Sequence, residues 1–161
     1  MLPRVYIETS IPSFYHEIRG EPEMAARREW TRDWWDRHRA RYTIVTSIPV
    51  IEELEVGDHP RKQECLRLIE NIALLPIPDL IVEIVDAYIQ HRLMPNDPKG
   101  DALHLALASY HRCQFLLTWN CAHLPNANKR EHIRHVNTLL GLYVPILTTP
   151  LELIEEPEED R

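Results

Sequence analysis

Five polar side chains fall where an α/β domain usually carries its chemistry. Glu8 directly follows a first apolar run, and Glu52 and Glu53 lie about one helical turn beyond the second β-type run. Asp101 stands near the start of the segment GDALHLALA, and Asn120 ends the segment FLLTWN. In open parallel α/β sheets the site lies in the crevice beyond the carboxyl ends of the strands. We therefore expect these groups, which are far apart in the sequence, to gather at one rim of the sheet.

The negative charge of such a cluster of acids determines which ligand it would bind. Two carboxylates about 4 Å apart repel by roughly 4 kcal/mol at an effective dielectric constant of about 20. Three around one crevice therefore need protons or a cation, and oxygen ligands without cysteine suit Mg²⁺ or Mn²⁺. Each group alone also has a structural explanation. Glu8 fits a solvated loop acid, Glu52 and Glu53 fit partners of a helix dipole, and Asn120 is a common turn residue.

Asp101 is the acid with the least room for a purely structural role. Asp97 and Pro98 already supply a helix cap and a first-turn proline. The helix that follows is apolar almost all round over residues 102–108, which is typical of a buried helix. A carboxylate at the mouth of a buried helix is costly unless it is paired or bound to a metal.

The elements that must position these residues alternate along the chain. Short apolar runs alternate with segments of helical periodicity, which predicts a parallel sheet covered on both faces. The fold class expected is a three-layer α/β domain with a mostly parallel, five-stranded sheet. The predicted strands are Val5–Ile7, Tyr42–Thr46, Leu74–Ile77, Phe115–Thr118 and Val144–Leu147. The predicted helices are Met24–Ala40, Pro49–Val56, Pro60–Ala73, Leu80–Leu93, Pro98–Arg112 and Ala127–Leu142.

Length and composition bound the possibilities. With 161 residues, the chain predicts one domain over residues 1–154 and an acidic, disordered tail over 155–161. The net charge of −7 means that any nucleic-acid contact must come from a local basic patch. Three cysteines without CxxC spacing, no signal peptide and no membrane-spanning run favour a cytoplasmic protein. Four glycines, with neither GxGxxG nor GxxxxGK, exclude dinucleotide and P-loop sites.

Four stretches of the chain together resemble a PIN domain, the nuclease fold of type II toxin–antitoxin toxins of the VapC kind. They are VYIETS, TSIPVIEEL, GDALHLALASYHRCQFLLTWNCAHLPN and VPILTTPLELI, and the resemblance covers about Val5 to Thr149. The third stretch is the most specific of the four. The resemblance implies Mg²⁺- or Mn²⁺-dependent cleavage of RNA, an antitoxin protein as partner, and a homodimer.

The resemblance also implies roles for individual residues. The family's catalytic and metal-binding positions correspond here to Glu8, Glu53, Asp101 and Asn120. Glu53 is chosen over Glu52 because the family's acid usually directly precedes an apolar residue, as Glu53 does. Glu8 stands where the family usually has Asp. Asn120 is neutral, so the site carries three formal charges rather than four.

Further polar residues are candidates for substrate contact. The hydroxyls of Thr9, Ser10 and Thr118 can reach a phosphate or a metal-bound water, or can serve the backbone instead. Lys129 and Arg130 form a small basic cluster just past Asn120, together with Arg134, and are the first candidates for phosphate contact.

Three other features have competing explanations. His104 lies one turn after Asp101, where it either orients that acid, touches substrate, or is a satisfied structural histidine. The arginine- and tryptophan-rich segment 24–42 is a solvated ion-paired face, an RNA-backbone patch, or an antitoxin or dimer surface. A zinc set has non-standard spacing and is disfavoured; its members would be Cys121, His123, His132 and His135.

The function expected is a metal-dependent endoribonuclease that hydrolyses RNA phosphodiester bonds. The alternative is a degenerate PIN domain that binds RNA or protein without cleaving. A phosphotransfer or receiver-like domain is disfavoured, because Glu8 is followed by Thr9 and Ser10 rather than by a second acid. The last strand is followed by threonines rather than by the lysine that such a domain needs.

Overall fold

A five-stranded parallel sheet organises the protein. The computed structural model describes residues 1–93, 100–120 and 127–154. The strand order is β3-β2-β1-β4-β5, and each neighbouring pair is parallel. The strands are β1 (Arg4–Ile7), β2 (Thr43–Thr46), β3 (Ala73–Leu74), β4 (Phe115–Leu117) and β5 (Ile146–Thr148). The predicted fold class is confirmed.

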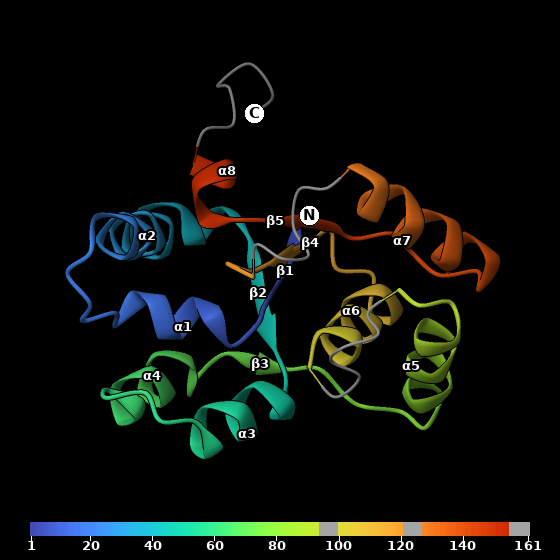
Figure 1. Cartoon of the computed structure of the whole chain (residues 1–161), viewed down its shortest axis with the longest axis horizontal. Helices are drawn as coiled ribbons and strands as arrows, with labels where there is room; N and C mark the ends of the chain where they lie inside the picture. The colour runs from blue at the N-terminus through green and yellow to red at the C-terminus, as the bar shows by residue number, and fades with distance from the viewer. Residues whose placement is uncertain (94–99, 121–126, 155–161) are drawn as a thin grey trace.

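Helices cover both faces of this sheet and complete three layers. In Figure 1, α1, α2 and α4 lie to the left of the strands, whereas α5, α6 and α7 lie to the right. The helices are α1 (Ser10–Tyr15), α2 (Pro22–Asp33), α3 (Ile48–Val56), α4 (Lys62–Ile69), α5 (Leu80–Gln90), α6 (Asp101–Tyr110), α7 (Ala127–Leu139) and α8 (Pro150–Ile154). Across the described parts of the chain, no helix is long and apolar enough to span a bilayer.

The core is built around the central strand. Val5, Tyr6 and Ile7 of β1 are fully buried, and Leu116 and Leu117 of the neighbouring β4 are buried beside them. A strand with helices on both faces has no solvent side, so its residues read as a continuous apolar run rather than an alternating one. Each large aliphatic side chain buried in this way contributes about 1.5–3 kcal/mol.

The long helix predicted for Met24–Ala40 is interrupted. Helix α2 ends at Asp33, a π-helical turn occupies Trp34–His38, and a 3-10 turn follows over Arg39–Arg41. Trp34 and Trp35 are adjacent and both buried. The wider π turn accommodates these two bulky neighbours, which a regular α-helix would direct about 100° apart.

Two strand predictions were wrong in extent, and prolines explain why. The strand predicted over Leu74–Ile77 is only Ala73–Leu74, because Pro76 lacks the backbone N–H that a ladder requires. The last strand begins at Ile146 rather than Val144, directly after Pro145.

Other differences lie at helix ends and in short segments. Helix α4 spans Lys62–Ile69 rather than Pro60–Ala73, and α7 ends at Leu139 rather than Leu142. Helices α1 and α8 have six and five residues, too few for helical periodicity to reveal them. Asp101 does open α6, with Gly100 before it at the cap position. The predicted cap at Asp97 and Pro98, the tail 155–161, and Cys121 and His123 of the zinc set lie outside the described residues.

Candidate functional site

The predicted site residues lie where neighbouring strands end. Glu8 follows β1, and Thr118 and Asn120 follow β4, which pairs with β1. Glu53 lies in α3, which begins after β2, and Asp101 is the first residue of α6. Because the strands are parallel, their carboxyl ends form one edge of the sheet.

A small cavity brings together two of the three predicted acids, Glu8 and Asp101, whereas Glu53 does not line it. It has a volume of about 20 Å³, close to the space of a single water molecule. Its wall combines polar and apolar side chains from the ends of β1 and β4, from α6 and from β5. The lining residues are Glu8, Asp101, His104, Leu116, Thr118, Asn120 and Leu147. Two carboxylates and one amide from three distant segments therefore share one void.

Glu8 is a buried acid held by its neighbours. Only 9% of its surface is exposed. Its Oε1 accepts a 2.9 Å hydrogen bond from the backbone N–H of Ser10 and another from the Ser10 hydroxyl. Burial raises the pKa of Glu8, although His104 and the Ser10 and Thr118 hydroxyls act in the opposite direction. In the absence of a cation, this carboxyl group therefore holds a proton more tightly than an exposed glutamate does.

Ser10 links the ends of two strands. Its Oγ accepts a 2.8 Å hydrogen bond from the backbone N–H of Trp119, beyond β4, while it donates to Glu8, beyond β1. The hydroxyl predicted to contact substrate is thus engaged within the protein, where it fixes the Glu8 side chain relative to the β4 end.

Asp101 and Asn120 form a direct pair. The Asn120 amide donates hydrogen bonds of 3.2 and 2.9 Å from Nδ2 to the two carboxylate oxygens of Asp101. The backbone N–H of Asn120 donates to the Thr118 hydroxyl at 2.9 Å. The loop after β4 therefore holds the acid at the start of α6.

Glu53 is held at both of its carboxylate oxygens. The Thr9 hydroxyl donates to Oε2, and His104 Nε2 lies 2.8 Å from Oε1. Burial alone would raise the pKa of Glu53, but the hydrogen bond and charge of His104, with the Thr9 hydroxyl, outweigh it and lower the pKa. Glu52, the neighbouring acid, is exposed and bonds to neither residue. Of the two candidates, Glu53 is the one that joins the site.

His104 lies between the acids. It is 2% exposed, and its Nδ1 lies 2.7 Å from the Tyr6 hydroxyl, which in turn lies 2.6 Å from Ser47 Oγ. Burial lowers the pKa of His104, but the hydrogen bond to Glu53 and the charges of Glu53, Glu8 and Asp101 outweigh it and raise the pKa. Both ring nitrogens are satisfied, and the acid that His104 contacts is Glu53 rather than Asp101.

The sequence reasoning missed Tyr6 and Ser47 as members of this network. The available signal was a hydroxyl-bearing residue inside a fully apolar strand, since buried tyrosine hydroxyls usually find a hydrogen-bond partner. Ser47 similarly stands at a strand end, where it precedes α3.

The donor set fits a hard divalent cation only in part. Within the described ranges, no three or more His, Cys, Asp or Glu residues are grouped closely enough to hold a metal ion. Two carboxylates do line the small cavity, those of Glu8 and Asp101. Mg²⁺ is usually held by one or two carboxylates and completes its shell with water. Glu8 and Asp101 therefore match the number of carboxylates that such an ion needs, while Glu53 lies outside the cavity, held by Thr9 and His104.

No protein-family model and no curated protein matches this chain. The resemblance to PIN domains accordingly depends on the residues quoted above and on their arrangement.

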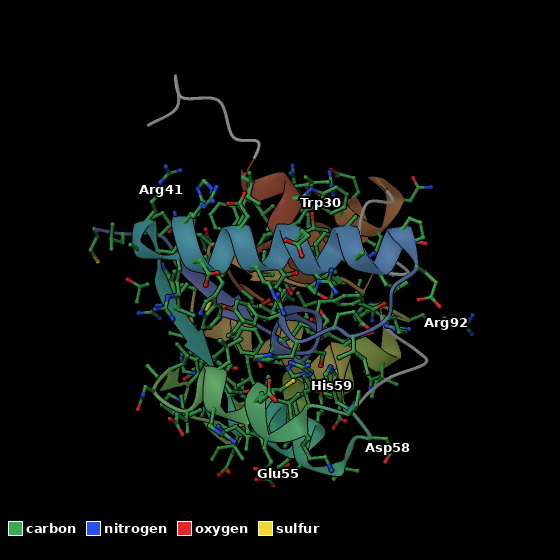
Figure 2. The ribbon with its side chains drawn as sticks, turned by 90° about the vertical axis from the view of Figure 1, so that its left-hand side faces the viewer. Trp30, Arg41, Glu55, Asp58, His59 and Arg92 are labelled. Carbon is green, nitrogen blue, oxygen red and sulfur yellow. The ribbon has the colours of Figure 1, made fainter. Side chains whose placement is uncertain are left out.

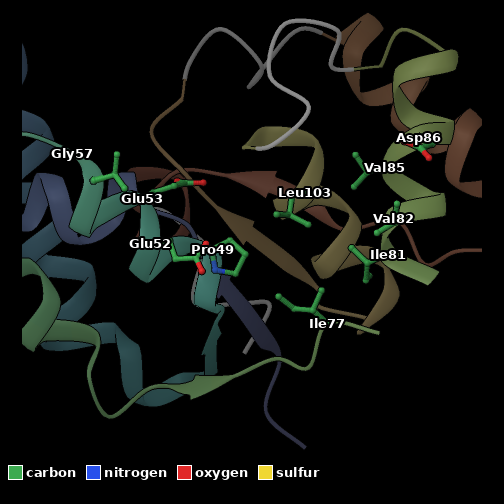
Figure 3. Close-up of a pocket in the computed structure, with 11 residues that line it drawn as sticks. Pro49, Glu52, Glu53, Gly57, Ile77, Ile81, Val82, Val85, Asp86 and Leu103 are labelled. Atoms are coloured by element: carbon green, nitrogen blue, oxygen red, sulfur yellow. The ribbon is translucent and has the colours of Figure 1, made fainter. Parts of the chain in front are cut away.

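An apolar groove adjoins the site on the α3 side. Its volume is about 720 Å³, and Glu53 lies at its edge. Figure 3 shows Pro49, Glu52 and Glu53 of α3 facing side chains of α5 across the groove, with Leu103 of α6 between them. The α5 side chains are Ile81, Val82, Val85 and Asp86. The groove therefore leaves an apolar surface exposed beside Glu53.

The predicted basic cluster lies on α7. The Lys129 amine is partly buried, which lowers its pKa, while the charge of Asp101 acts in the opposite direction. Lys129 is therefore close enough to Asp101 to sense its charge. Arg130 and Arg134 line a separate hollow of about 500 Å³ beside β5. Leu147 borders both this hollow and the small cavity.

The arginine-rich segment is an ion-paired face. Arg27 pairs with Glu23 at 2.7 Å, and Arg37 pairs with Asp33 at 3.5 Å. Trp30 stacks on Trp119 with ring centroids 6.1 Å apart. Figure 2 looks onto this face, where α2 crosses above α3 and α4. The arrangement supports the first of the three explanations given for this segment.

Proposed function

We propose that this protein is a Mg²⁺- or Mn²⁺-dependent endoribonuclease of the PIN type. The observation that carries the proposal is the shared cavity of Glu8 and Asp101, two acids from distant segments at the carboxyl edge of a parallel sheet. Such carboxylates repel one another unless a proton or a cation intervenes.

Glu8 and Asp101 would hold the ion, with Asn120 beside Asp101 and Glu53 at the outer side of His104. When bound, Mg²⁺ or Mn²⁺ lowers the pKa of water and stabilises charge on the leaving oxygen of a phosphodiester. The chain's own contribution is orientation. Ser10 fixes Glu8 and Asn120 fixes Asp101.

The RNA backbone would meet the basic residues of α7. Lys129 senses the charge of Asp101, and Arg130 is exposed on the same helix. Arginine and lysine pair with phosphate oxygens and fix the register of a strand without reading its sequence. The Thr9 and Ser10 hydroxyls would orient Glu53 and Glu8, and Thr118 would hold Asn120, next to the scissile phosphate.

We further propose that the protein acts in the cytoplasm as the toxin of a type II toxin–antitoxin pair and forms a homodimer. The family resemblance supports the antitoxin partner. The apolar groove between α3 and α5 supports the homodimer, because a second subunit would cover it.

The test is RNA cleavage by the wild type and by Asp101→Asn. The wild type should cut structured RNA with added Mg²⁺ or Mn²⁺ and stop with EDTA, while Asp101→Asn should lose activity and keep its fold. Asp58→Asn is the control, because Asp58 is exposed after α3 and lines neither the cavity nor the apolar groove. Full activity of Asp101→Asn would defeat the assignment.

A degenerate PIN domain that binds RNA or a protein without cutting is the second candidate. It is favoured by the neutral Asn120 and by the lack, within the described residues, of any group of three metal-binding side chains. Millimolar Mn²⁺ separates the two functions. Binding to the folded state raises the melting temperature, and a degenerate site should show no such rise.

A further inference from the structure

A continuous chain of buried hydrogen bonds leads from the sheet to the rim of the site. Ser47 Oγ and the Tyr6 hydroxyl lie 2.6 Å apart, Tyr6 and His104 Nδ1 lie 2.7 Å apart, and His104 Nε2 and Glu53 lie 2.8 Å apart. We propose that Tyr6 and His104 are positioning residues that fix the Glu53 carboxylate beside the cavity lined by Glu8 and Asp101. This inference rests on the proposed nuclease function and adds two residues to it.

The chain is shielded from competing water along most of its length. Tyr6 and Ser47 are fully buried and His104 is nearly so, whereas the Glu53 side chain is partly open at the rim. Hydrogen bonds in such surroundings are stronger than in water and polarise one another. The shielded end of the chain is thus rigid, and its exposed end is the carboxylate that it controls.

The directions of the bonds are consistent with that role. When the neutral His104 ring donates from Nε2 to Glu53, its Nδ1 must accept, and the Tyr6 hydroxyl is the donor within reach. Tyr6 in turn accepts from Ser47, and Thr9 donates to the other oxygen of Glu53. In this arrangement every donor is directed toward the carboxylate, which stays a pure acceptor.

The same chain ties Glu53 to the central strand. Tyr6 is on β1, two residues before Glu8, and His104 is on α6, three residues after Asp101. Glu53 is therefore located relative to both other acids through one imidazole ring. Thr9 holds the other carboxylate oxygen, so the two contacts together fix Glu53 where it lines the apolar groove.

The test compares Tyr6→Phe with Tyr88→Phe. Tyr88 is the matched control, because it too is fully buried and its hydroxyl bonds Asn137 at 2.7 Å, away from the site. Both variants should lose stability to a similar degree. Only Tyr6→Phe should lower kcat, by roughly 10–100-fold as for other residues that orient metal ligands, with KM for RNA unchanged. Equal kcat values for the two variants would overturn the positioning role.

A second variant keeps the test decisive if Tyr6→Phe does not fold. His104→Gln retains an amide N–H near the position of Nε2, whereas His104→Ala retains none. Recovery of kcat in His104→Gln relative to His104→Ala supports the inference, and equal loss in both overturns it.

A proton NMR measurement without metal tests the positioning role independently of RNA cleavage. In wild-type protein with EDTA, the His104 ring N–H should appear as a downfield proton resonance protected from solvent exchange. Tyr6→Phe should shift or broaden this resonance, and Tyr88→Phe should leave it unchanged. If the wild type cuts no RNA, the nuclease proposal fails while this spectrum still reports on the chain. A resonance that is unchanged in Tyr6→Phe overturns the positioning role even if RNA is cut.

Discussion

His104 Nε2 and Glu53 Oε1 lie 2.8 Å apart across 51 positions of sequence. This contact joins α6 to α3 above the carboxyl ends of the strands. It also places an imidazole among three acids, since the charges of Glu53, Glu8 and Asp101 all raise the pKa of His104. A ring that links the acids in this way makes the site sensitive to pH, to substitution and to added cations.

The first prediction concerns the pH dependence of stability in metal-free protein. The pKa of His104 is raised above 6.5, so its contribution is complete below that value and is lost as the pH rises through the folded pKa. The pKa of Glu53 is lowered from 4.5, so its contribution is lost as the pH falls through the folded value. The pair therefore stabilises most between about pH 4.5 and 6.5.

Urea unfolding of the wild type and His104→Gln from pH 5 to 9 measures this effect. The difference in unfolding free energy should be roughly 1.5–3 kcal/mol near pH 6, as for hydrogen bonds to charged groups, and should shrink at higher pH. A difference that is constant across the range would contradict a charged pair.

The second prediction is that Glu8→Gln stabilises the metal-free protein. Burial raises the pKa of Glu8, so its ionised form is disfavoured in the folded state at neutral pH. Glutamine keeps an acceptor for Ser10 and removes the charge. We expect a gain on the order of 1 kcal/mol, or about 2–4 °C in Tm for a domain of this size. The gain should disappear at acid pH, where the wild-type carboxyl is protonated.

The same variant should lose its response to Mn²⁺. Differential scanning fluorimetry with and without Mn²⁺ should show a rise in Tm for the wild type and none for Glu8→Gln. Glu17→Gln is the control, because Glu17 is also buried but pairs with Arg19, away from the cavity. An equal rise in all three proteins would exclude Glu8 as a ligand.

The third prediction exchanges an amide for an acid. Asn120→Asp replaces the donor that now faces both oxygens of Asp101 with a like charge. Repulsion of up to roughly 4 kcal/mol should destabilise the metal-free protein. Mn²⁺ should restore the stability, so the metal-induced rise in Tm should exceed that of the wild type. A rise no larger than that of the wild type would argue against a cation at this cavity.

The fourth prediction addresses the proposed homodimer. Val82 on α5 is 63% exposed and lines the apolar groove, so Val82→Asp should weaken self-association by about tenfold or more. Leu139→Asp is a matched control, because Leu139 is 62% exposed on α7 and does not line the groove. Light scattering coupled to size exclusion measures the oligomer. Identical behaviour of the two variants would mean that the dimer, if formed, uses another surface.

Much of the fold follows from local pattern. The strand β1 was predicted from its apolar run, and the helix α6 from its largely apolar sequence together with the cap and proline before it. The limits of β3 and the π turn at Trp34 depend on prolines and on packing between bulky neighbours. An argument from periodicity misses these effects, because it considers whether each residue is polar or apolar and not the shape of its side chain.

Some residues of the site could likewise be predicted from the sequence, and others could not. Strand ends are predictable, so Glu8, Asp101 and Asn120 could be assigned to one rim, and they line one cavity. The network through Tyr6 and Ser47 could not be predicted. Which hydroxyl meets which ring nitrogen is set by the register of β1 against β2 and by the seating of α6 on the sheet. The local sequence around His104 determines neither the strand register nor the position of α6 on the sheet.

Glu53 lines the apolar groove and is hydrogen-bonded to His104, which lines the small cavity, and this arrangement has one more consequence. A protein that fills the groove touches the same carboxylate that a cation in the cavity would sense. Binding at the two places would then be thermodynamically linked, and each event would change the affinity of the other by the same factor. Glu53 would thus couple the association of subunits at the groove to the binding of a metal ion in the cavity.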